Sequence, residues 1–226
     1  MHLPAGWPAS RILVDVLVHL AALGLGAALA FLPDQGPLAL GYFLVARVAY
    51  VLYASLELRS QSLRLGLESR ELAEARHATF HCRILRFQNV DGIAFLSLCV
   101  ATRSTLPWDD WEPAFLTAGV LLTLAGFGTK AWAVRCLGAS SYTWHDFFVP
   151  KAKFEPCTSG PYRYFKDPMY TLGYLQTYGI ALLCDSWYGL AASLFAHASI
   201  LIVNEVVEKP HFRRLCSAVV EPAESP

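Results

Sequence analysis

Long apolar stretches alternate with short polar segments along most of this chain, and their lengths indicate membrane-spanning helices. A helix of about 20 residues crosses about 30 Å of hydrocarbon. Six apolar runs approach or reach that length, at residues 11–33, 37–56, 92–107, 113–137, 168–184 and 187–207. The pattern therefore predicts an all-α fold, a polytopic transmembrane bundle of about six spans.

The composition agrees with a membrane protein. Of the 226 residues, 55% are hydrophobic and only 16% are charged, whereas a soluble domain has about 25% charged residues. Basic and acidic residues balance at 18 each, so no overall positive field suggests a nucleic-acid partner. The six cysteines form no CxxC pair, and no histidine stands at metal-ligand spacing, so no disulfide framework and no metal site are predicted.

The segment from Glu57 to Asp91 interrupts the apolar pattern with interleaved arginine and glutamate residues. Its leucines give it some apolar content, so we expect a helix that lies at the membrane interface. Arg47 lies inside the second apolar run, and we expect it to turn into the bundle or to reach the interface. We divide the chain into three regions: a helical hairpin plus this cytosolic amphipathic segment (1–91), a core (92–216) and a loose tail (217–226).

The distribution of basic residues predicts the orientation in the membrane. Three short connections contain no lysine or arginine, at residues 34–36, 107–112 and 185–186. The loops at 57–91 and 138–167, together with the tail after Val207, hold nearly all the basic residues outside the helices. By the positive-inside rule, both termini and the two large loops lie in the cytosol.

Two polar segments mark the same ends of two neighbouring spans. One runs from Gly160 to Tyr170, and the Gly-Pro pair that opens it predicts a turn. Pro168 is expected to begin a helix whose free N–H groups face an anion. Glu205 and Glu208 are three residues apart on the last span, so their carboxylates are expected to share a face. Together these features fit a zwitterionic ligand, although an interfacial aromatic belt with an acid pair reaching the surface explains them equally well.

Four blocks of residues carry a resemblance to a known family. The blocks are Phe127–Trp132, Gly138 with Ser141–Phe148, Gly160–Tyr170 extended through Gly173-Tyr174 and Tyr178-Gly179, and Glu205–His211. In this order they resemble the membrane-embedded phospholipid N-methyltransferases, especially the phosphatidylethanolamine N-methyltransferases. The related isoprenylcysteine carboxyl methyltransferases usually have Arg-His-Pro where this chain has Lys166-Asp167-Pro168.

The resemblance implies S-adenosyl-L-methionine as the cofactor. By analogy, the turn would hold its amino-acid end and ribose, the acids its ammonium or ribose hydroxyls, and the tyrosines its adenine or sulfonium. The cofactor-binding residues implied in this way are Gly160, Pro161, Tyr162, Arg163, Pro168, Met169, Tyr170, Gly173, Tyr174, Glu205 and Glu208.

A lipid amine has to lose a proton before it can accept a methyl group, so a base is expected near the site. His145 and Asp146, in the aromatic loop, are the first candidates and His211 is the next. Asp146 is alternatively a ligand for the substrate ammonium without a role in proton transfer.

The favoured function is methylation of a membrane lipid, phosphatidylethanolamine or its methylated intermediates, at a site that faces the cytosol. Three alternatives stay open: carboxyl O-methylation of isoprenylcysteine or another amphiphile, an NADPH-dependent sterol-type reductase, and a non-catalytic scaffold. The sequence leaves the number of added methyl groups and the oligomeric state open.

Overall fold

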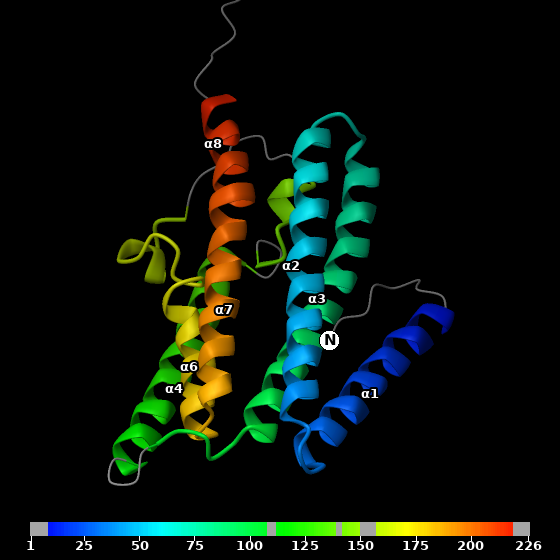
Figure 1. Ribbon diagram of the computed structural model, residues 1–226. Helices are drawn as coiled ribbons and strands as arrows, with labels where there is room; N and C mark the ends of the chain where they lie inside the picture. The colour runs from blue at the N-terminus through cyan, green and yellow to red at the C-terminus, as the bar shows by residue number, and fades with distance from the viewer. Residues whose placement is uncertain (1–8, 108–111, 139–141, 150–156, 219–226) are drawn as a thin grey trace, which may run out of the picture.

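The computed structural model describes residues 9–107, 112–138, 142–149 and 157–218, which form helices and turns without a strand (Figure 1). The long helices are α1 (Ala9–Phe31), α2 (Gly36–Arg64), α3 (Arg70–Ala101), α4 (Glu112–Leu137) and α7 (Trp187–Val203). A π-helical turn, η4 (Asn204–Glu208), joins α7 to α8 (Lys209–Ala218). Within these residues, five helices are long and apolar enough to cross a membrane. The predicted all-α membrane bundle is confirmed.

The expected span at residues 168–184 is not one continuous helix. A 3₁₀ turn, η2 (Gly160–Arg163), precedes it, and the span itself begins with turns that include η3 (Leu172–Tyr174), so that only α6 (Leu175–Leu183) is α-helical. At about 1.5 Å per residue, α6 is about 14 Å long and covers roughly half of a hydrocarbon layer. Irregular backbone at membrane depth has to be covered by protein or to line a cavity. Pro168 and Gly173 are accordingly buried.

The charged segment 57–91 forms the end of a helical hairpin. Its first part belongs to α2, and α3 begins at Arg70 after Ser69, whose Oγ accepts the N–H of Leu72. Helix was therefore the right prediction, and the segment belongs to two long helices, while its position at the membrane interface stays a prediction. The apolar side chains of this segment, such as Leu58 and Phe80, are buried inside the protein, so the two helices pair.

Both of the proposed region boundaries fall inside helices. Helix α3 runs unbroken through residues 91 and 92, where we separated the N-terminal region from the core. Helix α8 continues to Ala218, past the expected start of the tail at residue 217, and residues 219–226 lie outside the described residues.

Helices α4 and α6 approach closely because glycines face each other. A Cβ on Gly179 would lie 2.5 Å from the backbone N of Thr123 and 2.6 Å from the carbonyl oxygen of Gly119. A Cβ on Gly126 would overlap the backbone N of Gln176. Small residues allow such backbone contact between membrane helices. This contact holds α6, and with it the 3₁₀ turns, against α4.

We expect Gly179→Ala to lower the thermal stability of the protein in detergent. Besides Thr123 Oγ1, two of the three obstructing atoms belong to the backbone of α4 and cannot rotate away, so the cost is about 1–3 kcal/mol, as for an overpacked core. Gly128→Ala is the matched control. Gly128 lies on α4, the helix that Gly179 contacts, and a Cβ there meets nothing within 4 Å. Equal melting temperatures for the two variants would contradict this account of the contact.

Candidate functional site

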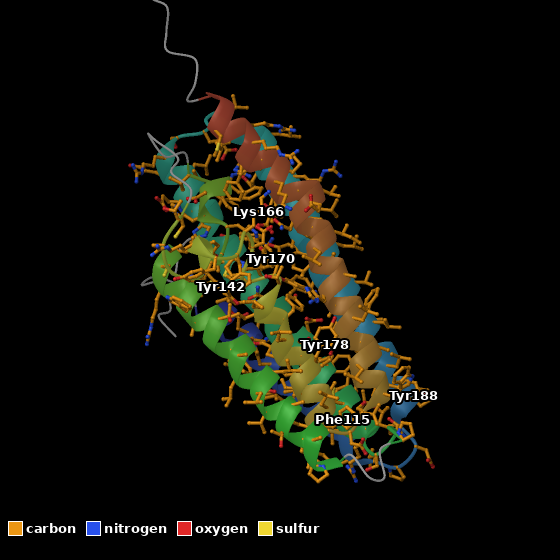
Figure 2. All side chains as sticks on the ribbon, turned by 90° about the vertical axis from the view of Figure 1, so that its left-hand side faces the viewer. Phe115, Tyr142, Lys166, Tyr170, Tyr178 and Tyr188 are labelled. Carbon is orange, nitrogen blue, oxygen red and sulfur yellow. The ribbon has the colours of Figure 1, made fainter. Side chains whose placement is uncertain are left out.

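A cavity of about 830 Å³ lies where the loop 142–149, the η2 turn and the start of α8 meet. Its volume is within the range of about 300–1,000 Å³ that is common for small-molecule sites. Figure 2 shows three residues of its lining, Tyr142, Lys166 and Tyr170, towards one end of the bundle, whereas Phe115 and Tyr188 lie at the other end.

The lining combines positive, negative and aromatic side chains. The cations are Lys166, Lys209 and Arg213, the acids are Asp146, Asp167 and Glu208, and the aromatic residues are Tyr142, Trp144, Tyr162, Tyr170 and Phe212. Lys209 Nζ lies 3.5 Å from Asp167 Oδ2, so one cation is already partly neutralised. Such a lining can bind both charged ends of a zwitterion and can place an aromatic face against a flat or cationic group.

Glu208 is the acid that is held most firmly in this cavity. Its side chain is buried, with 6% of the residue exposed, and Tyr170 Oη donates to its Oε1 at 2.7 Å. The side chain of Trp144 is a second hydrogen-bond partner. Two donors fix the orientation of the carboxylate and leave its remaining acceptor positions for a ligand in the cavity.

Glu205 does not share this face, so that prediction was wrong. Its carboxylate is exposed and pairs with Lys209. The physical reason is the π turn at Asn204–Glu208, where i→i+5 bonding places more residues in one turn than an α-helix does. Positions three apart then point in different directions. π turns occur often at functional sites.

The predicted helix start at Pro168 is also wrong. Residues 167–174 form a series of turns in which four backbone N–H groups already have backbone partners. Tyr170 N donates to Asp167 O at 3.1 Å, and Gly173 N donates to Pro168 O at 2.9 Å. These amides are therefore not available as an anion-binding helix end. The helix itself begins later, at Leu175.

The residues of the predicted cofactor site other than Glu205 have four kinds of position. Those that line the cavity are Tyr162, Met169, Tyr170 and Glu208. Those that shape the turn behind it are buried or tightly packed: Gly160, Pro161, Pro168 and Gly173. Arg163 is exposed, and Tyr174 lines a second cavity instead. Gly160 has a φ of +59°, and a Cβ on it would overlap Cys136 Sγ, so only glycine fits there.

Burial raises the pKa of Tyr162 above its ordinary value. The phenol therefore stays protonated at neutral pH and can donate a hydrogen bond into the cavity.

The two candidate histidines hold the loop 142–149 in place. His145 Nε2 lies 3.2 Å from Glu74 Oε2 on α3, and neither residue lines the cavity. His211 is buried, with its Nδ1 2.8 Å from Ser62 Oγ on α2 and its Nε2 3.3 Å from the carbonyl oxygen of Asp146. Of the three candidate bases, Asp146 is the one whose residue lines the cavity.

Several cavity residues were not among the predicted site residues. Trp144, Lys166 and Asp167 stood inside the quoted sequence blocks, and Lys209 and Arg213 follow Glu208 on the last helix. Their polar or aromatic character was the signal that could have selected them. Ser141, which belongs to the same blocks, lies outside the described residues.

The fold and the cavity define an integral membrane protein with a polar site at one end of its helical bundle. Residues 114–217, which include every residue that lines the cavity, match the phospholipid methyltransferase family. The resemblance expected from the sequence is therefore confirmed for this part of the chain.

Individual relatives give the same result. A phosphatidylethanolamine N-methyltransferase of Saccharomyces cerevisiae (strain YJM789) is 34% identical over 96 residues, which are 42% of this chain and 11% of that protein. The protein of the same name from Malassezia globosa is 37% identical over 100 residues, 43% of this chain and 10% of its own. The chain thus spans about a tenth of the length of these curated relatives. No solved structure matches it significantly.

Proposed function

We propose that this protein is an S-adenosyl-L-methionine-dependent methyltransferase that acts on the amine of phosphatidylethanolamine or its methylated intermediates. The observation that carries the proposal is the Glu208 carboxylate, buried in a cavity with cationic and aromatic walls inside the segment that matches the family. The relatives that share this segment are named for that activity.

The donor set of the cavity fits S-adenosyl-L-methionine. Glu208 would accept hydrogen bonds from its ammonium or from its ribose hydroxyls, as the resemblance implies. Lys166 or Arg213 would pair with its carboxylate. Tyr162 and Phe212 offer faces for the adenine. When bound, the cofactor supplies an electrophilic methyl group.

The lipid amine reacts through its lone pair, so its ammonium proton has to leave first. We assign that proton to Asp146, the candidate base that lines the cavity. His211 contacts the backbone of Asp146 and thereby helps to hold the loop in position.

We also propose that the cavity faces the cytosol. The connection between α2 and α3 and helix α8 lie at one end of the bundle in Figure 1, and the connections from α1 to α2 and from α6 to α7 lie at the other. The arginine-rich segments are at the first end, close to the cavity. The positive-inside rule therefore supports a cytosolic position for that end.

The proposal is tested by transfer of a radiolabelled methyl group from S-adenosyl-L-methionine to total membrane lipid, followed by separation of the head groups. Label is expected in methylated derivatives of phosphatidylethanolamine. Label found only in base-labile methyl esters would favour a carboxyl methyltransferase instead. Protection from heat by NADPH, and not by S-adenosyl-L-methionine, would favour a reductase, and protection by neither would favour a scaffold.

Asp146→Asn is expected to lower kcat about 10²- to 10⁴-fold, the usual contribution of a general base. Cofactor binding is expected to persist because asparagine keeps the size of the side chain. The measurement is steady-state methyl transfer together with equilibrium binding of the cofactor. His145→Gln is the comparison variant, since His145 lies outside the cavity. A larger loss of kcat in His145→Gln than in Asp146→Asn would show that the base is misassigned.

A further inference from the structure

A second cavity, of about 480 Å³, lies among α2, α3, α4, α6 and α7. Four residues line both this cavity and the first one: Tyr142, Trp144, Met169 and Tyr170. We call these four residues the shared wall. The two cavities therefore adjoin along these four residues. The wall lies within the segment that matches the family, but α2 and α3 do not.

A buried ion pair forms one side of the second cavity. Arg47, with 2% of the residue exposed, donates from Nη1 to Asp91 Oδ2 at 2.9 Å. Its Nε donates to Ser199 Oγ at 2.9 Å, and its Nη2 donates to Tyr174 Oη at 3.0 Å. The guanidinium is thus occupied on all its nitrogens by the protein, so its role here is to fix Asp91.

Other polar groups in the same cavity have no such partners. Among the described residues, Asp91 Oδ1 and Gln176 Oε1 are buried and accept no hydrogen bond. Lys130 Nζ lies 5.0 Å from the centre of the Tyr174 ring, and no hydrogen bond or salt bridge to it is seen within the described part of the chain. Buried polar groups are normally satisfied, so two acceptors without a hydrogen bond, beside an ammonium that contacts only an aromatic ring among the described residues, indicate a ligand.

The charges indicate what kind of ligand this is. Arg47 and Asp91 neutralise each other, which leaves the Lys130 ammonium as the charge to be compensated by an anion. The two unpartnered oxygens need a donor, and an ammonium or amine supplies several N–H groups. A single group with both an anion and an amine satisfies all three residues.

The second cavity also has an apolar side. Leu96 on α3 and Phe127 on α4 both line it, and they are 47% and 52% exposed. Helix α4 packs mainly against α6, whereas α3 packs mainly against α2 and α1. The cavity therefore lies between α3 and α4, which pack mainly against other helices, and Leu96 and Phe127 stay exposed at its border, where hydrocarbon chains can contact them.

We infer that the second cavity is the headgroup site for a zwitterionic aminophospholipid. Asp91 Oδ1 and Gln176 Oε1 bind its amine, Lys130 binds its phosphodiester, and its acyl chains leave between α3 and α4. The inference rests on the proposed function, since the amine then reaches the methyl donor where the two cavities adjoin, beside the shared wall. It also assigns substrate recognition to Asp91, a residue of the N-terminal half that lies outside the family match.

The test is binding of short-chain lipids to the purified full-length protein without cofactor, followed by calorimetry. Dihexanoyl phosphatidylethanolamine is expected to bind, and Asp91→Asn and Lys130→Met are each expected to weaken its binding about tenfold, the effect of losing one charge-assisted contact. Dihexanoyl phosphatidic acid lacks the amine, so its affinity is expected to fall in Lys130→Met but not in Asp91→Asn. Glycerophosphoethanolamine, which lacks the chains, is expected to bind more weakly than the lipid.

Lys166→Met is the matched control, because Lys166 lines the first cavity but not the second. It is expected to weaken binding of S-adenosyl-L-methionine and to leave lipid affinity unchanged, with the opposite pattern in Lys130→Met. Cofactor binding also reports whether each variant is folded. Lys130→Met keeps the test decisive if Asp91→Asn fails to fold, since Lys130 forms no ion pair within the described residues.

Two outcomes overturn the inference: no binding of the aminophospholipid to the wild-type protein, or unchanged affinity in Lys130→Met. Either result combined with methyl transfer to phosphatidylethanolamine rejects the headgroup site and leaves the proposed function intact. Binding that depends on Lys130, combined with no methyl transfer to any lipid amine, rejects the proposed function instead.

Discussion

Glu208→Gln is expected to weaken the binding of S-adenosyl-L-methionine about 10- to 100-fold. The glutamine keeps an oxygen that can accept from Tyr170 and Trp144, so the loop and the π turn stay in place. It loses the negative charge that pairs with the ammonium or ribose of the cofactor. A hydrogen bond to a charged group contributes about 1.5–3 kcal/mol, which corresponds to this range of affinity.

Glu205→Gln serves as the matched control for this experiment. Glu205 carries the same side chain three residues earlier, but it is exposed and pairs with Lys209. Exposed ion pairs contribute about 0–1 kcal/mol, so cofactor affinity is expected to change little. Equilibrium binding of the labelled cofactor measures both variants. A stronger effect of Glu205→Gln than of Glu208→Gln would show that the carboxylates are assigned in the wrong order.

Arg47→Met is expected to destabilise the protein by about 3–5 kcal/mol, the usual effect of removing one partner of a buried ion pair. The methionine fills the space of the arginine stem but leaves Asp91 without its cation. It also leaves Ser199 and Tyr174 without the hydrogen bonds that now join α2 to α7 and η3.

The double variant Arg47→Met/Asp91→Leu is expected to recover part of that stability. Replacing both members of a buried pair by apolar residues is often neutral, because no uncompensated charge remains. Unfolding by denaturant in detergent, followed by circular dichroism, measures both variants. A double variant that is less stable than Arg47→Met would contradict the view that the unpaired Asp91 is the source of the cost.

The long membrane-spanning helices could be predicted from the hydropathy of the sequence. Five long helices follow from the length of their apolar runs. The run at 168–184 was misread because an apolar turn buried against α4 has the same composition as a short span. The turns there depend on close contact between Gly173 and Lys130, two residues far apart in the sequence.

The site could be predicted only in part. The turn at Gly160–Tyr170 and the acid Glu208 were expected together, and both border the first cavity. The separation of Glu205 from Glu208 was not predictable from spacing, because it depends on a π turn. The pairing of Arg47 with Asp91 joins α2 to α3 across 44 positions, and no local pattern indicates such a contact.

The shared wall has a consequence for the order of events. If a water-soluble donor occupies the cavity on one side of Tyr142, Trp144, Met169 and Tyr170, and a lipid occupies the other, each has its own route of exchange. Spent donor can then leave towards the aqueous phase while the same lipid keeps its place between α3 and α4. Successive methyl groups can be added in one residence of the lipid, with its chains held in the bilayer throughout.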